Sequence, residues 1–206
     1  MRERILEQAT SLFMKWGIKN ITLDEIAKGL GISKKTIYQY FENKGKLVYE
    51  VSKAHMLEEE REIKELTAES ANAIDELVRL VQCMTRGLNE VNPQVVYEVK
   101  KYYPESWNLF EEHKKHFLEG LVRHNLQQGI EEGLFRPSLD VEIITRMRLA
   151  QIEVGFDEKF FPPGKFDYRQ VHIQMFETYL YGIVTEKGRK LLEEYLERYA
   201  TVIQKL

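Results

Sequence analysis

The sequence predicts an all-α protein, because helical periodicity runs through nearly all of its 206 residues. Apolar residues recur at spacings of three and four, and the alternating patterns typical of strands are almost absent. Capping residues, glycines and prolines divide the chain into segments of helical length. With 43% hydrophobic and 31% charged residues, the chain is long enough for one or two folded domains with a core.

Each expected helix is bounded by residues that start or end helices. Gly17 lies where a left-handed C-terminal cap is expected, and Asn43 is placed to cap the long helix that follows it. Pro93 and Pro104 each take a first helical position. The expected helices are 2–16, 22–30, a short one after Ser33, a long one after Asn43 that continues into 58–64, then 71–89, 93–102, 105–132, 139–158, 167–184 and 186–205.

A helix that ends at a glycine is followed near the N-terminus by a short turn and a second capped helix. Thr22 and Glu25 have the spacing of a capping box, and Gly31 can adopt the positive φ that a tight turn needs. Ser33 is placed to cap the second helix, and Ile37 fills the angle between the two helices. These features together predict a helix-turn-helix, whose second helix enters the major groove of DNA.

The exposed positions of this motif carry groups that suit DNA. The formal net charge of the chain is −3, yet residues 1–50 hold more lysine and arginine than acids. Basic side chains in the first turn of a helix add to its own partial positive charge, and a glutamine can pair bidentately with adenine. The alternative is a helical bundle with solvated lysines. The expected DNA contacts are Thr22, Ser33, Lys34, Lys35, Thr36, Tyr38, Gln39, Tyr40 and Lys44.

The stretches ILEQATSLFMKWGI, TLDEIAKGLGIS and KKTIYQYFENKGKL resemble, in order and spacing, the DNA-binding domain of the tetracycline-repressor (TetR) family of bacterial transcription regulators. The resemblance covers residues 4–51 and implies an all-helical homodimer with a ligand-responsive C-terminal domain. Lys35 and Tyr40 stand where a small residue and a histidine are frequent, so the resemblance does not predict base preference. It implies phosphate contacts from Thr22, Tyr38 and Lys44, and groove contacts from Lys34, Lys35, Thr36 and Gln39.

We expect a helix-turn-helix DNA-binding domain at 1–48 and a helical effector-binding and dimerisation domain at 49–206. Two late helices carry long apolar seams, and Gly182 permits close approach. Such helices can pair with their symmetry mates in a four-helix bundle, which places two heads on a two-fold symmetric DNA site. The alternative is that both seams pack inside one chain. The expected interface residues are Ile143, Met147, Ala150, Val154, Ile173, Phe176, Leu180 and Val184.

Aromatic residues gather in the middle helices. Such a stripe is either ordinary core or, in part, the lining of an apolar pocket with a few polar groups. The resemblance favours a pocket for a small apolar or amphipathic effector but does not identify the ligand. The expected pocket residues are Met84, Leu88, Tyr97, Tyr103, Trp107, Phe110, His113, Phe117, Met147 and Gln151.

Other classes of protein find little support in the sequence. The chain has no apolar run of about 18 residues and no apolar signal core at its N-terminus, so we expect a cytoplasmic protein. Its single cysteine, Cys83, rules out an internal disulfide. His113 and His116 share a helix face, but such a pair is more often surface than metal site, and no cofactor, metal or catalytic residue is expected.

The sequence therefore predicts a one-component transcriptional regulator, namely a repressor released from a palindromic operator by a small ligand. A helical DNA-binding or adaptor protein without small-molecule control is the alternative. An enzyme has no positive support, because neither a phosphate-binding glycine loop nor a nucleophile motif occurs.

Overall fold

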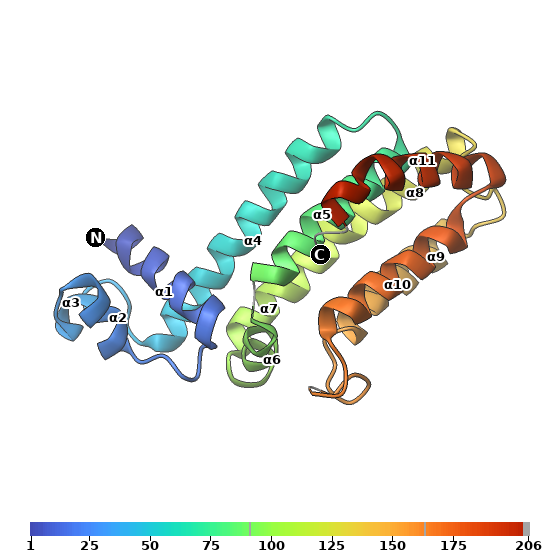
Figure 1. The fold of residues 1–206 in the computed structure, drawn as a ribbon. Coiled ribbons are helices and arrows are strands. Elements are labelled where there is room, and N and C mark those ends of the chain that lie inside the picture. The colour runs from blue at the N-terminus through green and yellow to red at the C-terminus, as the bar shows by residue number, and fades with distance from the viewer. Residues whose placement is uncertain (91, 163, 204–206) are drawn as a thin grey trace. The chain divides into compact units, whose positions relative to one another are not determined.

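The structure, a computed structural model of the chain, is all-α as the sequence predicts (Figure 1). It describes residues 1–90, 92–162 and 164–203, with side chains except at 88–90, 93 and 199–203. An isolated bridge joins Phe135 and Val184. None of the described helices is both long and apolar enough to cross a lipid bilayer.

The helices follow the expected segments in order. Their bounds are α1 Arg2–Trp16, α2 Leu23–Leu30, α3 Lys34–Tyr38, α4 Lys44–Ala68, α5 Ala73–Glu90, α6 Pro93–Tyr102, α7 Pro104–His113, η1 Lys114–Leu118, α8 Glu119–Glu131, α9 Val141–Val154, α10 Tyr168–Ile183 and α11 Glu186–Ile203. The single helix expected at 105–132 is instead α7 and α8 joined by the π-helical η1, a segment that contains no proline or glycine. The helix expected at 139–158 ends earlier, at Val154, where Gly155 caps it.

The chain forms two compact units. One is Met1–Glu59 with Leu88–His113, and the other is Glu60–Gly87 with Lys114–Leu206. The first unit therefore contains α6, α7 and the part of α4 up to Glu59, in addition to the three N-terminal helices. The functional division into a DNA-binding domain at 1–48 and an effector domain at 49–206 stays a prediction.

The core of the first unit is an apolar face shared by the helix-turn-helix and α6. Ile5, Ala9 and Phe13 recur at spacings of four on α1 and are almost completely buried. Val95 and Val99 of α6 belong to the same core. Burying one such aliphatic or aromatic side chain stabilises a fold by about 1.5–3 kcal/mol. Helix α6 is therefore held firmly against the N-terminal helices.

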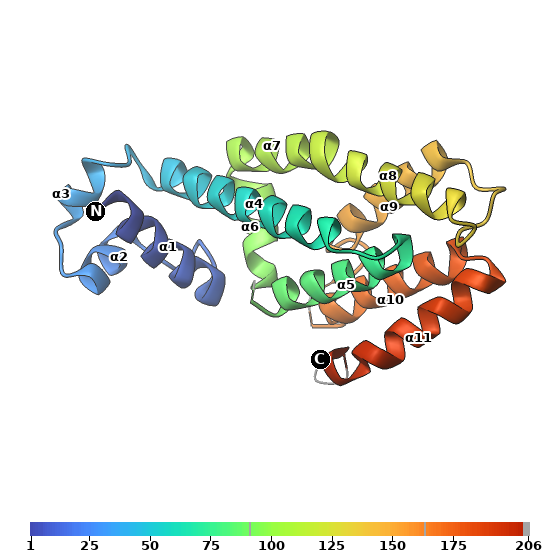
Figure 2. The ribbon, with the colours of Figure 1, turned by 90° about the horizontal axis from the view of Figure 1, so that it is seen from above.

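The core of the second unit is built mainly by α5, α8, α10 and α11. Three residues are fully buried there: Leu126 of α8, Leu192 of α11, and Phe135, which lies between α8 and α9. Helix α9 packs along α8 and also contacts α10, as Figures 1 and 2 show. The pair α9 and α10 carries most of the positions at which the sequence predicts an interface.

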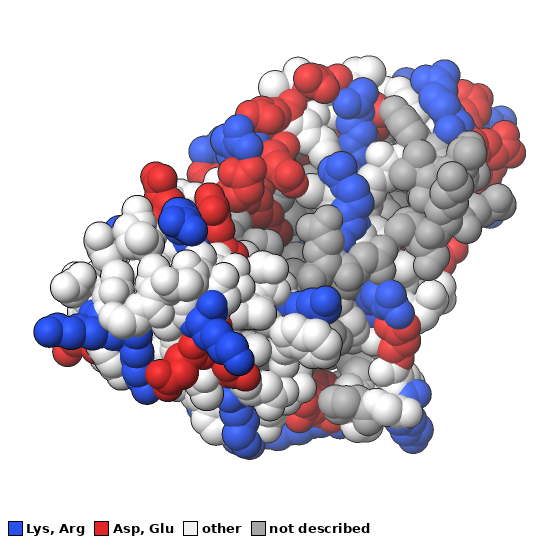
Figure 3. All heavy atoms as spheres, turned by 60° about the vertical axis from the view of Figure 1, so that its left-hand side comes forward, with Lys and Arg blue, Asp and Glu red and all other residues white. Residues whose placement is uncertain are grey.

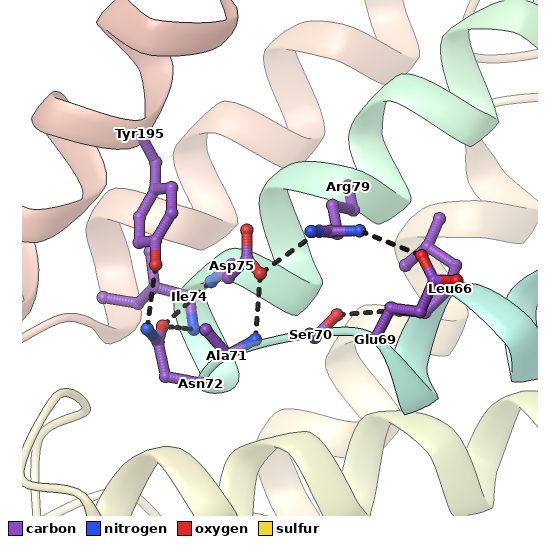
Figure 4. A network of polar contacts seen from close by, with 9 residues as sticks. All are labelled: Leu66, Glu69, Ser70, Ala71, Asn72, Ile74, Asp75, Arg79 and Tyr195. Atoms are coloured by element: carbon purple, nitrogen blue, oxygen red, sulfur yellow. Dashed lines mark hydrogen bonds and ion pairs between the residues drawn. The ribbon is translucent and has the colours of Figure 1, made fainter.

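A polar network joins the start of α5 to α11 within the second unit (Figure 4). Asn72 Oδ1 accepts hydrogen bonds of 3.0 Å from the amides of Ile74 and Asp75, which caps α5. Its Nδ2 donates to the Tyr195 hydroxyl at 3.1 Å, and Arg79 Nε donates to the Asp75 carboxylate at 3.1 Å. The network is consistent with a structural role, because each of these contacts satisfies a helix end or a side chain beside it.

Candidate nucleic-acid interface

Side-chain caps fix the N-terminal ends of α2 and α3, as predicted. The Glu25 amide donates to Thr22 Oγ1 at 3.2 Å, and the Glu25 carboxylate accepts from the Thr22 amide at 2.6 Å. Gly31 has φ +66° and ψ 30°, the left-handed conformation that favours glycine. The Thr36 amide donates to Ser33 Oγ at 3.2 Å at the start of α3. The turn between α2 and α3 is thereby set in one geometry.

Helix α3 packs on the core through Ile37, and most of its other side chains are exposed. Ile37 is 0% exposed within the core, whereas Tyr38 and Tyr40 are 48% and 44% exposed. Gln39 is the C-terminal cap of this short helix and is exposed. The remaining predicted contacts divide into the exposed Thr22, Ser33, Lys34 and Lys35 and the half-buried Thr36 and Lys44. The arrangement presents a polar and aromatic surface of the kind that contacts DNA bases and phosphates.

Lys34 is paired with an acid of the preceding helix. Its Nζ lies 2.6 Å from Asp24 Oδ2, and this hydrogen bond raises the pKa of Lys34. Both side chains are substantially exposed, so the pair contributes little to stability. The Asp24 carboxylate nevertheless reduces the positive potential beside the predicted groove contacts.

Lys44 is held against the loop between α1 and α2. Its Nζ donates to the Ile18 carbonyl at 2.5 Å and lies 5.9 Å from the centre of the Phe13 ring. Burial lowers the pKa of Lys44, while the carboxylates of Glu98 and Glu25 act in the opposite direction. The phosphate contact expected of Lys44 stays a prediction; the ammonium has three N–H donors, and the Ile18 carbonyl accepts from one of them.

A buried carboxylate of α6 is bonded to the same loop, and the sequence interpretation missed it. Glu98 is 1% exposed; its Oε2 accepts from the Lys19 amide at 2.8 Å and its Oε1 from Gln94 Nε2 at 3.0 Å. It lies on the buried stripe of α6 with Val95 and Val99. The sequence did indicate this residue, because Glu98 falls on the same helical face as Val95 and Val99. An acid on an apolar helix face requires a polar partner.

Charges of both signs are interspersed on one face of the molecule. On the face drawn in Figure 3, lysine and arginine side chains lie among acidic ones and are not gathered in one continuous patch. Exposed pairs such as Lys46 with Glu105 and Arg2 with Glu50 contribute to this pattern in the first unit. The basic excess of residues 1–50 is therefore partly offset locally, and affinity for DNA depends on a few positioned groups.

The predicted pocket residues of the first unit are largely packed into it. Tyr103 and Trp107 pack against the core of the helix-turn-helix. This packing favours the interpretation that these two residues belong to an ordinary core. The Trp107 and Phe110 rings are tilted with centroids 4.9 Å apart, and the Tyr97 hydroxyl accepts from Lys101 Nζ at 2.6 Å. His113 Nε2 lies 3.8 Å from Glu59 Oε2, and the side chain of His113 is nearly buried.

The predicted pocket residues of the second unit have different surroundings. Met84 packs against the core, and the ring of Phe117 has the Lys64 ammonium 5.6 Å from its centre. Met147 is 54% exposed on α9, and its assignment to a pocket stays a prediction. Gln151 is half-buried, whereas the side chain of Leu88 lies outside the described residues. A ligand pocket stays a prediction.

The predicted dimer seam is exposed on α9. Ile143 is 56% and Met147 54% exposed, Ala150 is exposed on the same face, and Val154 is half-buried. Large apolar side chains that recur on one exposed face are typical of surfaces that bind another protein. This part of the predicted interface is available in the monomer.

The predicted seam on α10 faces the other way. Phe176, Leu180 and Val184 are buried in the core of their own unit, because their helix face packs inward, and Ile173 is half-buried. Their assignment to an intermolecular surface stays a prediction, although their own unit already covers these three side chains. The opposite face of α10 is exposed and carries Gln174, Thr178, Tyr181 and Gly182.

Comparison with known proteins gives both sequence and fold relatives. A family model described as bacterial regulatory proteins, tetR family, matches residues 5–51. The HTH-type transcriptional repressor KstR2 of Mycobacterium tuberculosis is 27% identical over 192 residues, which cover 90% of this chain and 94% of that protein.

Solved structures share the fold. A transcriptional regulator from Saccharomonospora viridis in complex with choline matches with a TM-score of 0.72 and 22% identity, covering 90% of this chain and 98% of that one. The regulator FadR of Bacillus subtilis in complex with stearoyl-CoA matches with a TM-score of 0.64 and 22% identity, covering 89% and 100% of the two chains. At these identities the likeness extends to the fold alone.

Proposed function

Because the chain belongs to the TetR family of bacterial regulatory proteins, we propose that it is a repressor whose helix α3 reads operator DNA. The observation that carries this proposal is the exposed surface of α3, which two caps and the buried Ile37 hold in one orientation. Lys35 and Gln39 contact base edges, while Thr22, Tyr38 and Lys44 contact phosphates. The phosphate contacts position the helix, and the base contacts supply sequence preference.

Selection of bound duplexes from a random pool tests the proposal. The purified protein should enrich a two-fold symmetric site with half-sites about 10 base pairs apart, or a multiple of that spacing. Gln39→Ala and Lys35→Ala should change the preferred bases. Lys53→Ala is the control for Lys35→Ala, because it removes the same single positive charge from an exposed position of α4. It should leave the preferred bases unchanged. A failure to enrich any site at low ionic strength would contradict the proposal.

The repressor acts as a homodimer through α9 and α10. The exposed apolar face of Ile143, Met147 and Ala150 supports this assembly, together with the exposed Tyr181 and Gly182 of α10. Burial of such side chains against a second copy removes apolar area from water, and a two-fold axis places two α3 helices on a palindromic operator. The pairing thus explains how a short helix achieves useful affinity.

A small apolar or amphipathic ligand releases the repressor. Structural neighbours have been solved with choline and with stearoyl-CoA, so this fold holds chemically different ligands. A hundredfold loss of operator affinity requires about 2.7 kcal/mol of difference between the affinities of the ligand for the two states. The competing hypothesis is a DNA-binding protein without such control, for which no ligand changes operator affinity.

Helix α6 is the element through which the ligand acts on the DNA-binding surface. Its Glu98 holds the Lys19 amide, and the Asn92 amide at its start donates to the Met14 carbonyl of α1 at 3.0 Å. The same loop carries Ile18, whose carbonyl binds Lys44. Displacement of α6 therefore moves the loop before α2 and the ammonium of Lys44 together.

A further inference from the structure

A buried arginine of the second unit has no acidic partner among the described residues. Arg148 on α9 is 5% exposed, and its closest polar contact is a long one of 3.5 Å from Nη1 to Gln151 Oε1. Its guanidinium lies 4.5 Å from the centre of the Phe176 ring and 5.4 Å from that of Tyr179. An aromatic face partly balances the charge but does not provide a carboxylate for the N–H donors.

Polar atoms without partners lie on the same helix faces. Thr145 Oγ1 and His172 Nε2 are buried and have no hydrogen-bond partner in the described structure. Thr145 precedes Arg148 by three residues on α9, and Gln151 follows it by three, so the three residues share one face. On α10, His172 is one turn before Phe176, whose ring lies under Arg148. We name these five residues, together with Tyr179, the Arg148 cluster: Thr145, Arg148, Gln151, His172, Phe176 and Tyr179.

The Arg148 cluster offers one positive charge and neutral groups at physiological pH. Burial and the charge of Arg148 lower the pKa of His172 to about 4, so its imidazole is neutral. Burial raises the pKa of the Tyr179 hydroxyl, which therefore keeps its proton. Arg148 stays charged although burial lowers its pKa to about 10. A cation, hydroxyl groups and an imidazole are groups that bind an anion.

Leaving such a charge without a counter-charge opposes folding. A buried ion costs free energy unless a partner compensates it, and an apolar residue of similar volume is often more stable at such a position. A cation stacked on aromatic rings for structural reasons would gain from a nearby acid, yet no ion pair of the described residues includes Arg148. A ligand that brings its own negative charge accounts for both the missing acid and the unpartnered Thr145 and His172.

We propose that the Arg148 cluster binds the carboxylate group of an effector whose remaining part is apolar. This proposal deepens the ligand control described above and rests on it. The planar guanidinium matches a carboxylate in bidentate geometry, and one carboxylate balances the single charge of the cluster. Phe156, whose ring centre lies 4.2 Å from that of His172, adds an apolar neighbour for the rest of the ligand. A cationic ligand is repelled.

Thermal unfolding with a series of carboxylates from acetate to decanoate tests the proposal, with decanol as the uncharged match. Decanoate at ten times its dissociation constant should raise the Tm of the wild-type protein by about 3 °C, and decanol should not. Arg148→Met should have a Tm at or above that of the wild type without ligand, and decanoate should not raise it. Arg146→Met removes an exposed arginine of the same helix and should respond as the wild type does.

Operator binding separates this site from the proposed function. Arg148→Met should bind the selected operator with unchanged affinity but should not be released by decanoate. If the wild type binds no DNA, the proposed repressor fails, while the thermal shifts still decide the carboxylate site. The site is overturned if no carboxylate of the series raises the Tm, if Arg148→Met still responds, or if Arg148→Met unfolds several degrees below the wild type.

Discussion

Acid should destabilise the protein through His172, because the folded chain keeps this imidazole neutral. The side chain is 4% exposed, and burial together with the charge of Arg148 lowers its pKa from the ordinary 6.5 to about 4. Between these values the unfolded chain binds a proton that the folded chain does not, so stability falls as pH decreases. From pH 7.5 to pH 5 the loss attributable to His172 is about 2 kcal/mol.

Urea denaturation at pH 7.5 and pH 5, at one protein concentration, measures this loss. His172→Gln removes the titrating group and should make the decrease in unfolding free energy smaller by about 2 kcal/mol. His116→Gln changes an exposed histidine and should keep the decrease of the wild type. Equal decreases for the wild type and His172→Gln would refute the assignment of a buried neutral imidazole.

Four further substitutions test separate parts of the structure. Lys44→Ala should reduce the slope of log affinity against log salt concentration by about one unit in a fluorescence anisotropy titration, and an unchanged slope would exclude its phosphate contact. Asp24→Asn frees Lys34 and should raise affinity for any duplex by about 2–5-fold in the same assay, whereas weaker binding would contradict this. Thr22→Ala removes the cap of α2 and should lower the unfolding free energy by about 1 kcal/mol in urea, with no change as the contrary result. Met147→Glu should weaken the dimer at least about tenfold in sedimentation equilibrium, and an unaltered dimer would place the interface elsewhere.

The local features of the helix-turn-helix were predictable from the sequence because they depend on neighbouring residues. A capping box needs only Thr22 and Glu25 at the right spacing, and a left-handed turn needs only Gly31 after an amphipathic helix. Ile37 is buried for the same reason, since its position in the helical period places it opposite the polar residues of α3. The predicted element order holds throughout the described chain.

The direction of an apolar helix face was not predictable in this way. The spacing of Phe176, Leu180 and Val184 indicates a seam but does not say whether a partner or the same chain covers it. In the structure, α5, α8 and α11 cover the face of α10 that carries these residues, within the second unit. On α9 the same kind of pattern, at Ile143 and Met147, remains exposed.

The contacts of the buried polar groups were also not predicted from the sequence. Glu98 accepts from an amide 79 residues away, and Arg148 and His172 meet only when α9 and α10 pack together. Their pairing depends on contacts distant in sequence, which periodicity does not encode. A charged residue within an apolar stripe is nevertheless a readable signal, and it applies to both Glu98 and Arg148.

The most direct measurement concerns the base edges beneath α3. Anisotropy titrations of the selected operator and of each single-base variant give a discrimination profile for the wild type and for Gln39→Ala. We expect Gln39→Ala to lose discrimination worth about 1–3 kcal/mol at one base pair of each half-site and to keep it elsewhere. Identical profiles for the two proteins would contradict the claim that α3 reads the sequence of the operator.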